Sequence, residues 1–595
     1  MPSPAKCCCK GADRMEVPVG TKDVSVQSGQ SRREFLKTAG SLALASQVLP
    51  VCLSASAADN EGILKSKEIL GNKAVKSGMA KVVTILHTAD IHGQLLTHDE
   101  FFIEDGRPVY RRRGGYATLK TMIDTLRQEN PGGSLLIDGG DCFQGSGVAA
   151  LSKGQALIPL MNHLRYDVVL PGNWEVLYGK QRMIQDMSGY TAAKVCANMY
   201  HDNSRGSADL IFPPYFVKSV GGLKVGFIGY NDPLTPVRQS PAFSKGIRFS
   251  HPETNVEGYI KTLRKDLKCD LVFLLTHMGL AQQVGLADQP YIEGIDYVLG
   301  ADTHERVRVP LKREYAYVTE PGAFGSFISK LDIAIENGEV KEHSYQLLDV
   351  DPEIYKEDED MKALVTQVRA PYRKRVDRVI GSTKTPLVRY YVIETPLDNF
   401  LTDAIMWKFN PDIVLSNGFR FCPPLVPDPK TGIAEITVDY LWSMLPDESE
   451  AKRGMILGKQ LLSFIENELE NAFAVDPGNR FGGWLVRFKG MEINFTIRGE
   501  KGKRVNWIRV KGQPLNLESV YTIVACERDG DPYTTLCRLE NVMNPERLGV
   551  TLHAIVEEYL RLHSPVAPKI EGRATATDAP SGLLTQLMDV GYEFR

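Results

Sequence analysis

The chain has almost no excess charge of either sign. Its 595 residues carry 70 Lys and Arg against 73 Asp and Glu, a formal net charge of −3. Proteins that bind DNA or RNA usually present a strongly basic surface, so we expect no nucleic-acid partner. The composition, 43% hydrophobic and 24% charged, excludes the disordered, collagen-like and coiled-coil classes. A chain of this length is expected to fold into more than one domain.

Long apolar runs are also missing. The run at residues 39–53 is interrupted by Gln47 and Pro50, and it is shorter than the ~20 apolar residues that a membrane-spanning helix needs. It follows Ser31-Arg32-Arg33-Glu34-Phe35-Leu36-Lys37 and precedes small residues at 54–58. This order resembles a twin-arginine (Tat) signal. We expect residues 1–58 to direct export by the Tat machinery to the periplasm. Cleavage is expected after Ala57 or Ala58, which leaves no stable membrane span. The alternative is that the signal is retained as a membrane anchor.

Cysteine and histidine are sparse and unevenly placed. Beyond the signal region the cysteines are scattered and form no Cys-x-x-Cys pair, which excludes a zinc ribbon or a thioredoxin-like site. They are Cys142, Cys196, Cys269, Cys422, Cys526 and Cys537, and the sequence assigns no disulfide among them. No histidine occurs between His343 and His553. A metal site built from imidazoles must therefore come from the N-terminal half.

Short apolar runs rich in β-branched residues alternate with stretches of helical spacing from Val82 onward. They lie at 82–86, 134–137, 167–170, 225–228, 271–275 and 297–299. This alternation predicts an α/β layered domain over residues 79–350. Residues 351–385 are predicted to connect, with one long solvated helix over 351–380. A smaller second α/β domain is expected over 386–575, with alternating strands at 484–488 and 521–525, followed by a tail at 576–595.

Five of these runs are followed directly by polar clusters with flanking glycines. The clusters lie at 87–95, 138–145, 171–175, 276–279 and 300–305. Ligand sites in open α/β sheets collect outside the carboxyl ends of the strands. Asp, His and Asn in these clusters are ligand types that divalent metals accept. The sequence therefore predicts a metal site at this edge.

The cluster order Asp-x-His, Gly-Gly-Asp-x-Phe-Gln-Gly, Gly-Asn, Thr-His-x-Gly and Thr-His-Glu resembles the calcineurin-like metallophosphoesterases and, more closely, the 5′-nucleotidase family. The resemblance covers nearly all of the chain after the signal. It implies a four-layer α/β-β/α catalytic domain and a C-terminal substrate domain of the 5′-nucleotidase type. It further implies two divalent metal ions bridged by Asp141, one completed by Asp90, His92 and His304, the other by Asn173, His277 and Asp302. Such a pair of cations activates water as a nucleophile at neutral pH.

Two positions depart from the nucleotidase pattern. The nucleotidases read Gly-Asn-His-Glu with a catalytic histidine, where this chain has Trp174. The expected His-x-His of the last motif is Asp302-Thr303-His304, which makes the ligand set richer in oxygen and favours manganese over zinc.

Trp174-Glu175, followed by Tyr178-Gly179, resembles the SoxB thiosulfohydrolase branch, although SoxB has His where this chain has Asn173. Segments 394–399, 416–421 and 482–487 are also more similar to SoxB. The resemblance implies a dimanganese hydrolase that releases sulfate from a cysteine-S-thiosulfonate on a carrier protein of SoxYZ type. The expected catalytic residues are Asp141, Asn173, Trp174 and Arg420, whose planar fork suits a sulfonate or phosphate.

Two alternatives remain open. One is a 5′-nucleotidase or UDP-sugar hydrolase that acts on small phosphorylated substrates, for which Trp484 could stack on a base; Trp484 fits a core position equally well. The other is a catalytically inactive relative that keeps the metal. The missing histidine counts against the first alternative, and plausible ligands at all seven positions count against the second.

Overall fold

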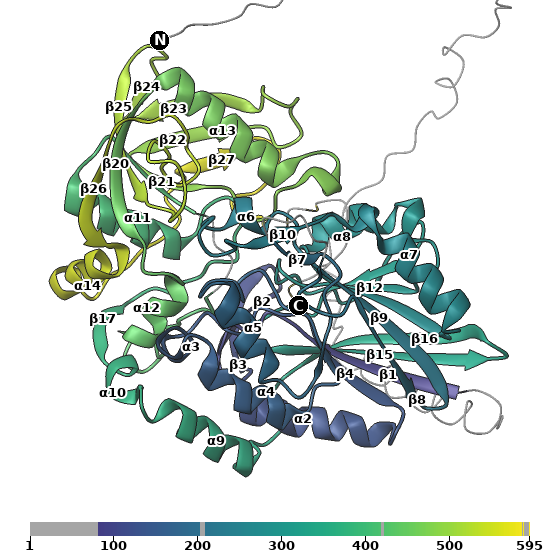
Figure 1. The fold of residues 1–595 in the computed structure, drawn as a ribbon. Helices are drawn as coiled ribbons and strands as arrows, with labels where there is room; N and C mark the ends of the chain where they lie inside the picture. Colours follow the sequence, from purple (N-terminus) through teal and green to yellow (C-terminus); the bar gives the residue numbers. More distant parts are fainter. Residues whose placement is uncertain (1–80, 203–208, 418–421, 586, 588–593, 595) are drawn as a thin grey trace, which may run out of the picture. The chain divides into compact units, whose positions relative to one another are not determined.

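The computed structural model describes residues 81–202, 209–417, 422–585, 587 and 594 (Figure 1). The expected Tat signal at 1–58 lies outside these residues. Within the described part, no helix has both the length and the apolar character needed to cross a membrane. The described chain forms two α/β domains, as the sequence predicts.

The first domain is built on two six-stranded sheets. In the first sheet, β1, β4, β5 and β6 run parallel, and β15 and β16 add an antiparallel edge. In order across this sheet, the strands are β16 (Glu339–Asp349), β15 (Phe327–Glu336), β1 (Lys81–Thr88), β4 (Ser134–Asp138), β5 (Val168–Val169) and β6 (Ala193–Lys194). The second sheet has the order β13 (Leu311–Lys312), β14 (Tyr317–Thr319), β12 (Tyr297–Leu299), β11 (Leu271–His277), β9 (Leu223–Asn231) and β8 (Tyr215–Val220).

Alternating side chains along the second sheet define four layers. Phe227 and Phe273 share one core with the first sheet and its helices α2 and α4, whereas Ile228 and Leu274 share another with α7 and α8. Successive side chains of a strand point to opposite faces, so the order is helix, sheet, sheet, helix. Figure 1 shows the two helix pairs on opposite sides of the strands. The helices of this domain are α2 (Tyr116–Glu129), α3 (Gly147–Ser152), α4 (Ile158–Leu164), α5 (Lys180–Ser188), α6 (Thr235–Arg238), α7 (Val256–Lys261) and α8 (Leu280–Ala287).

Two short strand pairs complete this domain. They are the hairpin β2 (His98–Glu104) with β3 (Arg107–Arg113), and β7 (Met199–His201) with β10 (Ile247–Phe249).

The connecting segment corrects one prediction. Instead of one helix over 351–380, the chain forms α9 (Glu359–Arg369) and α10 (Arg373–Val376), and then enters β17 (Val379–Thr383). Pro371 stands between the two helices. Proline has no N–H to donate and its ring clashes with the preceding turn, which explains why α9 ends there.

The second domain packs a five-stranded and a four-stranded sheet around one core. The five-stranded sheet has the order β21 (Arg487–Lys489), β18 (Ile413–Ser416), β25 (Val520–Cys526), β20 (Glu450–Leu457) and β26 (Met543–Thr551). The four-stranded sheet has the order β24 (Gln513–Pro514), β23 (Val505–Val510), β22 (Met491–Phe495) and β27 (Ala574–Ala576). β19 (Ala434–Thr437) pairs with β17, and the helices are α11 (Pro396–Phe409), α12 (Val438–Met444), α13 (Gly458–Phe473) and α14 (Leu552–His563).

The alternating strand predicted at 484–488 is wrong in extent and in pattern. β21 begins only at Arg487, and Leu485, Val486 and Phe488 are all buried. Trp484 also belongs to the core, and its indole N–H donates to the Arg389 carbonyl at 3.0 Å. The strand predicted at 521–525 is present as β25.

Candidate metal centre

The seven expected ligands lie at or just beyond the carboxyl ends of parallel strands. Asp90 and His92 follow β1, Asp141 follows β4 and Asn173 follows β5. From the other sheet, His277 ends β11, while Asp302 and His304 follow β12. Because these strand ends face one another across the two sheets, side chains up to 212 residues apart in sequence come into contact.

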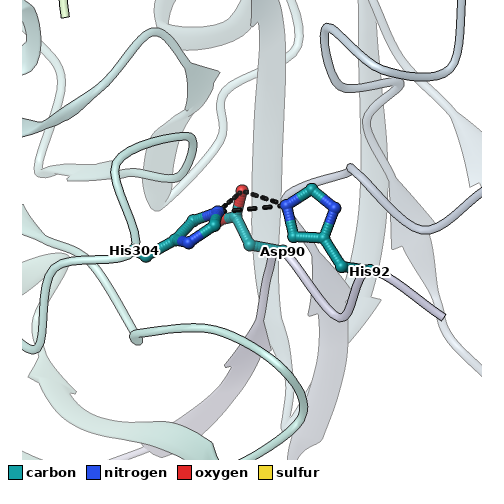
Figure 2. A group of neighbouring side chains, drawn as sticks. All are labelled: Asp90, His92 and His304. Carbon is teal, nitrogen blue, oxygen red and sulfur yellow. Dashed lines mark hydrogen bonds and ion pairs between the residues drawn. The ribbon is translucent and has the colours of Figure 1, made fainter. Parts of the chain in front are cut away.

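One group consists of Asp90, His92 and His304 (Figure 2). His304 Nε2 lies 3.5 Å and His92 Nε2 lies 4.0 Å from Asp90 Oδ1. The two imidazole nitrogens are 3.0 Å apart. All three residues are buried.

A second group, Asp90, Asp141 and His277, adjoins the first. His277 Nε2 lies 3.1 Å from Asp141 Oδ2 and 3.9 Å from Asp90 Oδ1. Asp141 Oδ2 is also 3.8 Å from His92 Nε2, in the first group. Both Asp141, the expected bridge, and Asp90 therefore reach the imidazoles of both groups.

Asn173 and Asp302 contact each other and residues of the loop after β9. The Asn173 amide donates to Asp302 Oδ1 at 2.6 Å, and this oxygen is 3.9 Å from His277 Nε2. The Asn173 carbonyl oxygen accepts a hydrogen bond from Gln239 at 2.9 Å. The structure thus brings all seven residues together, and the Asn173 side chain is hydrogen-bonded to Asp302 and Gln239.

The backbone at this centre is strained. Five of the seven residues have a left-handed φ of 49° to 88°, a conformation that residues other than glycine seldom adopt. They are Asp90, His92, Asp141, Asp302 and His304. Such strain persists where the surrounding structure enforces it, and it is concentrated at functional sites.

The donor set fits divalent cations. His92 Nδ1 lies 3.1 Å from the Gln144 carbonyl and His277 Nδ1 lies 2.7 Å from the Gly139 carbonyl, contacts that orient each Nε2 toward the carboxylates. Burial, with His304 as a second cause, lowers the pKa of His92 to about 4, so this imidazole is neutral at pH 7. Burial, with the carboxylates of Asp141 and Asp302 as further causes, raises the pKa of Asp90 to about 7 against the opposing effect of His277 and His92. A buried carboxylate is costly unless it is paired, and a cation would supply such a partner. Two bound cations would activate water and neutralise charge at the reacting centre.

Comparisons with known proteins agree with this architecture. The sequence signature of the calcineurin-like phosphoesterases matches residues 83–306, and that of the 5′-nucleotidase C-terminal domain matches residues 379–527. The chain thus combines a calcineurin-like phosphoesterase domain with a 5′-nucleotidase C-terminal domain. It is a phosphoesterase-family hydrolase with two adjoining metal-binding groups.

Individual relatives are distant. The trifunctional nucleotide phosphoesterase YfkN of Bacillus subtilis is 24% identical over 553 residues, 84% of this chain and 35% of that protein, so the chain spans about a third of its length. Sulfate thiohydrolase SoxB of Thermus thermophilus has a TM-score of 0.74 at 22% identity, covering 84% of this chain and 98% of SoxB. A 5′-nucleotidase precursor, also of Thermus thermophilus, has a TM-score of 0.72 at 23% identity, covering 84% of this chain and 100% of the precursor. Both structures share the two-domain fold.

Trp174 lies where the nucleotidases are expected to carry a catalytic histidine. Its side chain is 8% exposed, and its backbone N–H donates to Asp141 Oδ1 at 2.7 Å. It lines a cavity of about 90 Å³ beside the metal-binding groups. Residues of both domains line this cavity with it: Asp141, Asn173, Arg238, Gln239, Asp302, His304, Asn417, Glu468, Asn471, Phe481, Gly482, Gly483, Trp484 and Arg538. Arg420, the expected anion-binding residue, lies outside the described residues.

Three supporting residues of this family hydrolase were not predicted. The Glu175 carboxylate accepts backbone N–H groups from the loop that carries Asp141, while Arg238 and Gln239 contact Asp302 and Asn173. A sequence signal for this loop did exist, since the polar pair Asn231-Asp232 stands at the end of an apolar run, now β9, a few residues before Arg238 and Gln239. This pair lacks the histidine or the glycine-flanked ligand that marks the five clusters at the other strand ends.

Proposed function

We propose that the chain is a periplasmic thiosulfohydrolase of SoxB type that uses two divalent cations, in the first place manganese. Its substrate would be a cysteine-S-thiosulfonate on a carrier protein of SoxYZ type. Water would add to the terminal sulfonate sulfur, the sulfur–sulfur bond would break, and sulfate, a persulfide anion on the carrier and two protons would result. Export by the Tat pathway belongs to the same proposal.

The observation that carries this proposal is the chemistry around Trp174. Among the described residues that line the cavity, the only imidazole is that of His304, which belongs to a metal-binding group. Expulsion of an alkoxide from a phosphate ester gains about 10²- to 10⁴-fold from a positioned acid. A persulfide is a weaker base and leaves without a proton, so this cavity is better suited to a sulfur leaving group.

The test is a pair of assays on the purified protein with Mn²⁺. Sulfate release is measured from a thiosulfonated carrier peptide, and phosphate release from AMP. The wild type is expected to release sulfate and to hydrolyse AMP slowly. Trp174→His should raise AMP turnover, whereas Trp407→His, a control on the surface of α11, should not. Rapid AMP hydrolysis by the wild type, with no sulfate release, would refute the proposal.

A second candidate is a 5′-nucleotidase or UDP-sugar hydrolase. Phe481 and Trp484 of the second domain line the cavity, and aromatic rings there could stack on a nucleobase. For this candidate, Phe481→Ala is expected to raise the KM for AMP with little change in kcat. The same substitution should leave the KM for the thiosulfonated peptide unchanged.

A further inference from the structure

Arg238 is a buried cation beside the second metal-binding group. Its side chain, at the end of α6, is 10% exposed. Nη1 donates to Asp232 Oδ2 at 2.6 Å and Nη2 donates to Asp302 Oδ2 at 2.8 Å. Asp232 is itself fixed by the Leu234 backbone N–H at 2.9 Å, so it anchors the guanidinium from one side.

The contact with Arg238 changes what Asp302 offers to a cation. Asp302 Oδ2 is bound to Arg238, and Asp302 Oδ1 is bound to the Asn173 amide. A carboxylate that shares its charge with a guanidinium attracts a metal ion less strongly than a free one. The neighbouring residue, Gln239, holds the carbonyl oxygen of Asn173. Consecutive residues of one short segment therefore control both Asn173 and Asp302.

Arg238 also faces the space where a substrate would bind. It lines the cavity together with Asp141, Trp174 and His304. A guanidinium has five N–H donors, more than two carboxylate contacts consume. Gly482 of the second domain packs directly against it: a Cβ at Gly482 would lie 2.8 Å from Arg238 Nη2. Because Gly482 has no side chain, the Arg238 guanidinium has room to lie beside the cavity.

We propose that Arg238 has two linked roles. It neutralises Asp302, the expected ligand that lies 3.9 Å from His277 of the second group, and so limits how tightly a cation is bound there. It also binds the oxyanion of the substrate. The second role rests on the proposed function only because it requires an anionic substrate. Both a thiosulfonate and a nucleotide are anions. Removal of the guanidinium should then change cation and anion binding in opposite directions. A purely structural role would weaken both.

The experiment measures two affinities by titration calorimetry on the full-length protein. Mn²⁺ binding is measured after chelator treatment, and inorganic sulfate binding is measured with Mn²⁺ at saturation. Arg238→Gln is expected to tighten Mn²⁺ binding about tenfold. It should weaken sulfate binding about 10- to 100-fold, the value of a charge-assisted hydrogen bond. Arg238→Lys keeps the charge and should leave Mn²⁺ binding unchanged while it weakens sulfate binding.

Arg264→Gln is the matched control. Arg264 also pairs with a carboxylate, its Nη2 lying 2.5 Å from Asp296 Oδ2, and it is absent from the cavity lining. It should alter neither affinity. In the double variant Arg238→Gln/Asp302→Asn, the affinity for Mn²⁺ should return to the wild-type value or fall below it. The affinity for sulfate should stay low.

The proposal would be overturned if Arg238→Gln weakened both the Mn²⁺ and the sulfate affinity, or if it changed neither. If that variant does not fold, tighter Mn²⁺ binding or unaltered sulfate binding in Arg238→Lys would overturn it as well. Neither measurement requires turnover. A protein that shows the opposite shifts but releases no sulfate from the thiosulfonated peptide would refute the proposed function alone.

Discussion

The carboxylate of Glu175 organises the loop that presents Asp141. It accepts backbone N–H groups from Cys142 and Phe143 on one oxygen, and from Asp141 and Gly172 on the other, at 2.6 to 3.1 Å. In Glu175→Gln, an amide NH₂ would face two of these donors. Each unsatisfied buried group costs about 1–3 kcal/mol, so we expect the free energy of unfolding in urea to fall by about 2–5 kcal/mol.

The control for this prediction is Glu129→Gln. Glu129 pairs with Lys330 and is 39% exposed, so its loss should cost less than about 1 kcal/mol. Equal effects of the two substitutions would contradict the anchoring role of Glu175.

Asp141 reaches imidazoles of both metal-binding groups, so its loss should affect both. Asp141→Asn removes the negative charge but keeps the shape of the side chain. We expect metal affinity and turnover to fall by more than about 100-fold, because a lost ligand should exceed the 10- to 100-fold cost of a lost supporting contact. Metal content by mass spectrometry and turnover on either substrate measure this effect.

Asp412→Asn, in the second domain beside Lys511, serves as the control for Asp141→Asn and should keep its metal. Unchanged metal content in Asp141→Asn would show that the site is wrongly assigned.

The candidate ligands could be named from the sequence because each follows an apolar run or ends one, within a recognisable motif. The supporting contacts could not. Arg238 meets Asp302 across 64 residues between two strand ends of the second sheet, and Gln239 meets Asn173 across 66 residues between the two sheets. These contacts exist only once the domain has folded. The role of Arg420 remains a prediction.

Helix α14 packs on α12 through a buried histidine. The His553 ring lies 4.3 Å from the Trp442 ring between centroids, and Nε2 is 2.9 Å from the Leu445 carbonyl oxygen. Burial lowers the pKa of His553, against the opposing effect of that carbonyl and of nearby carboxylates, those of Asp447, Glu448 and Glu557.

A lowered pKa in the folded state makes this packing sensitive to acid. Below pH ~6.5 the unfolded chain binds a proton at this histidine while the folded protein does not. The stability present above pH ~6.5 is therefore lost as the pH falls, by at most about 1.4 kcal/mol per pH unit. His553→Asn should flatten the dependence of the unfolding free energy between pH 7 and pH 5. The exposed His563→Asn on the same helix should not, and equal slopes in wild type and His553→Asn would refute the prediction.

Elements that are stabilised by their own sequence pattern were predicted best. The β-branched runs became β1, β4, β9 and β11, each near its expected position. The prediction of one connecting helix was wrong because the apolar residues keep their helical spacing across Pro371. The proline itself marks the position where the helix ends. The prediction of a strand at 484–488 was wrong because distant contacts hold the start of this segment: Trp484 donates to the Arg389 carbonyl across 95 residues, and the Leu485 backbone N–H donates to the Val392 carbonyl at 3.2 Å.

At the scale of the whole molecule, the two domains meet at the loop of the metal centre. Gly147 N donates to Asp439 Oδ1 of α12 at 2.7 Å, and the Ser443 hydroxyl donates to the Gly145 carbonyl at 2.8 Å. Gly145 ends the polar cluster that carries Asp141, and Gly147 begins α3. A net charge of −3 reveals neither this contact nor the buried carboxylates, because composition averages over the whole chain.

Because the second domain contacts this loop, metal binding should stabilise both domains together. In calorimetry, chelator treatment is expected to lower the temperature of a single unfolding transition, and Mn²⁺ at 100 times its Kd should restore about 2.7 kcal/mol. Asp439→Ala leaves the Gly147 N–H without its acceptor and should split the unfolding into two transitions. Mn²⁺ should then raise the temperature of the first domain's transition alone. Glu500→Ala, which removes an exposed carboxylate of the second domain, should keep one transition. A metal-dependent shift of both transitions in Asp439→Ala would show that the coupling runs through other contacts.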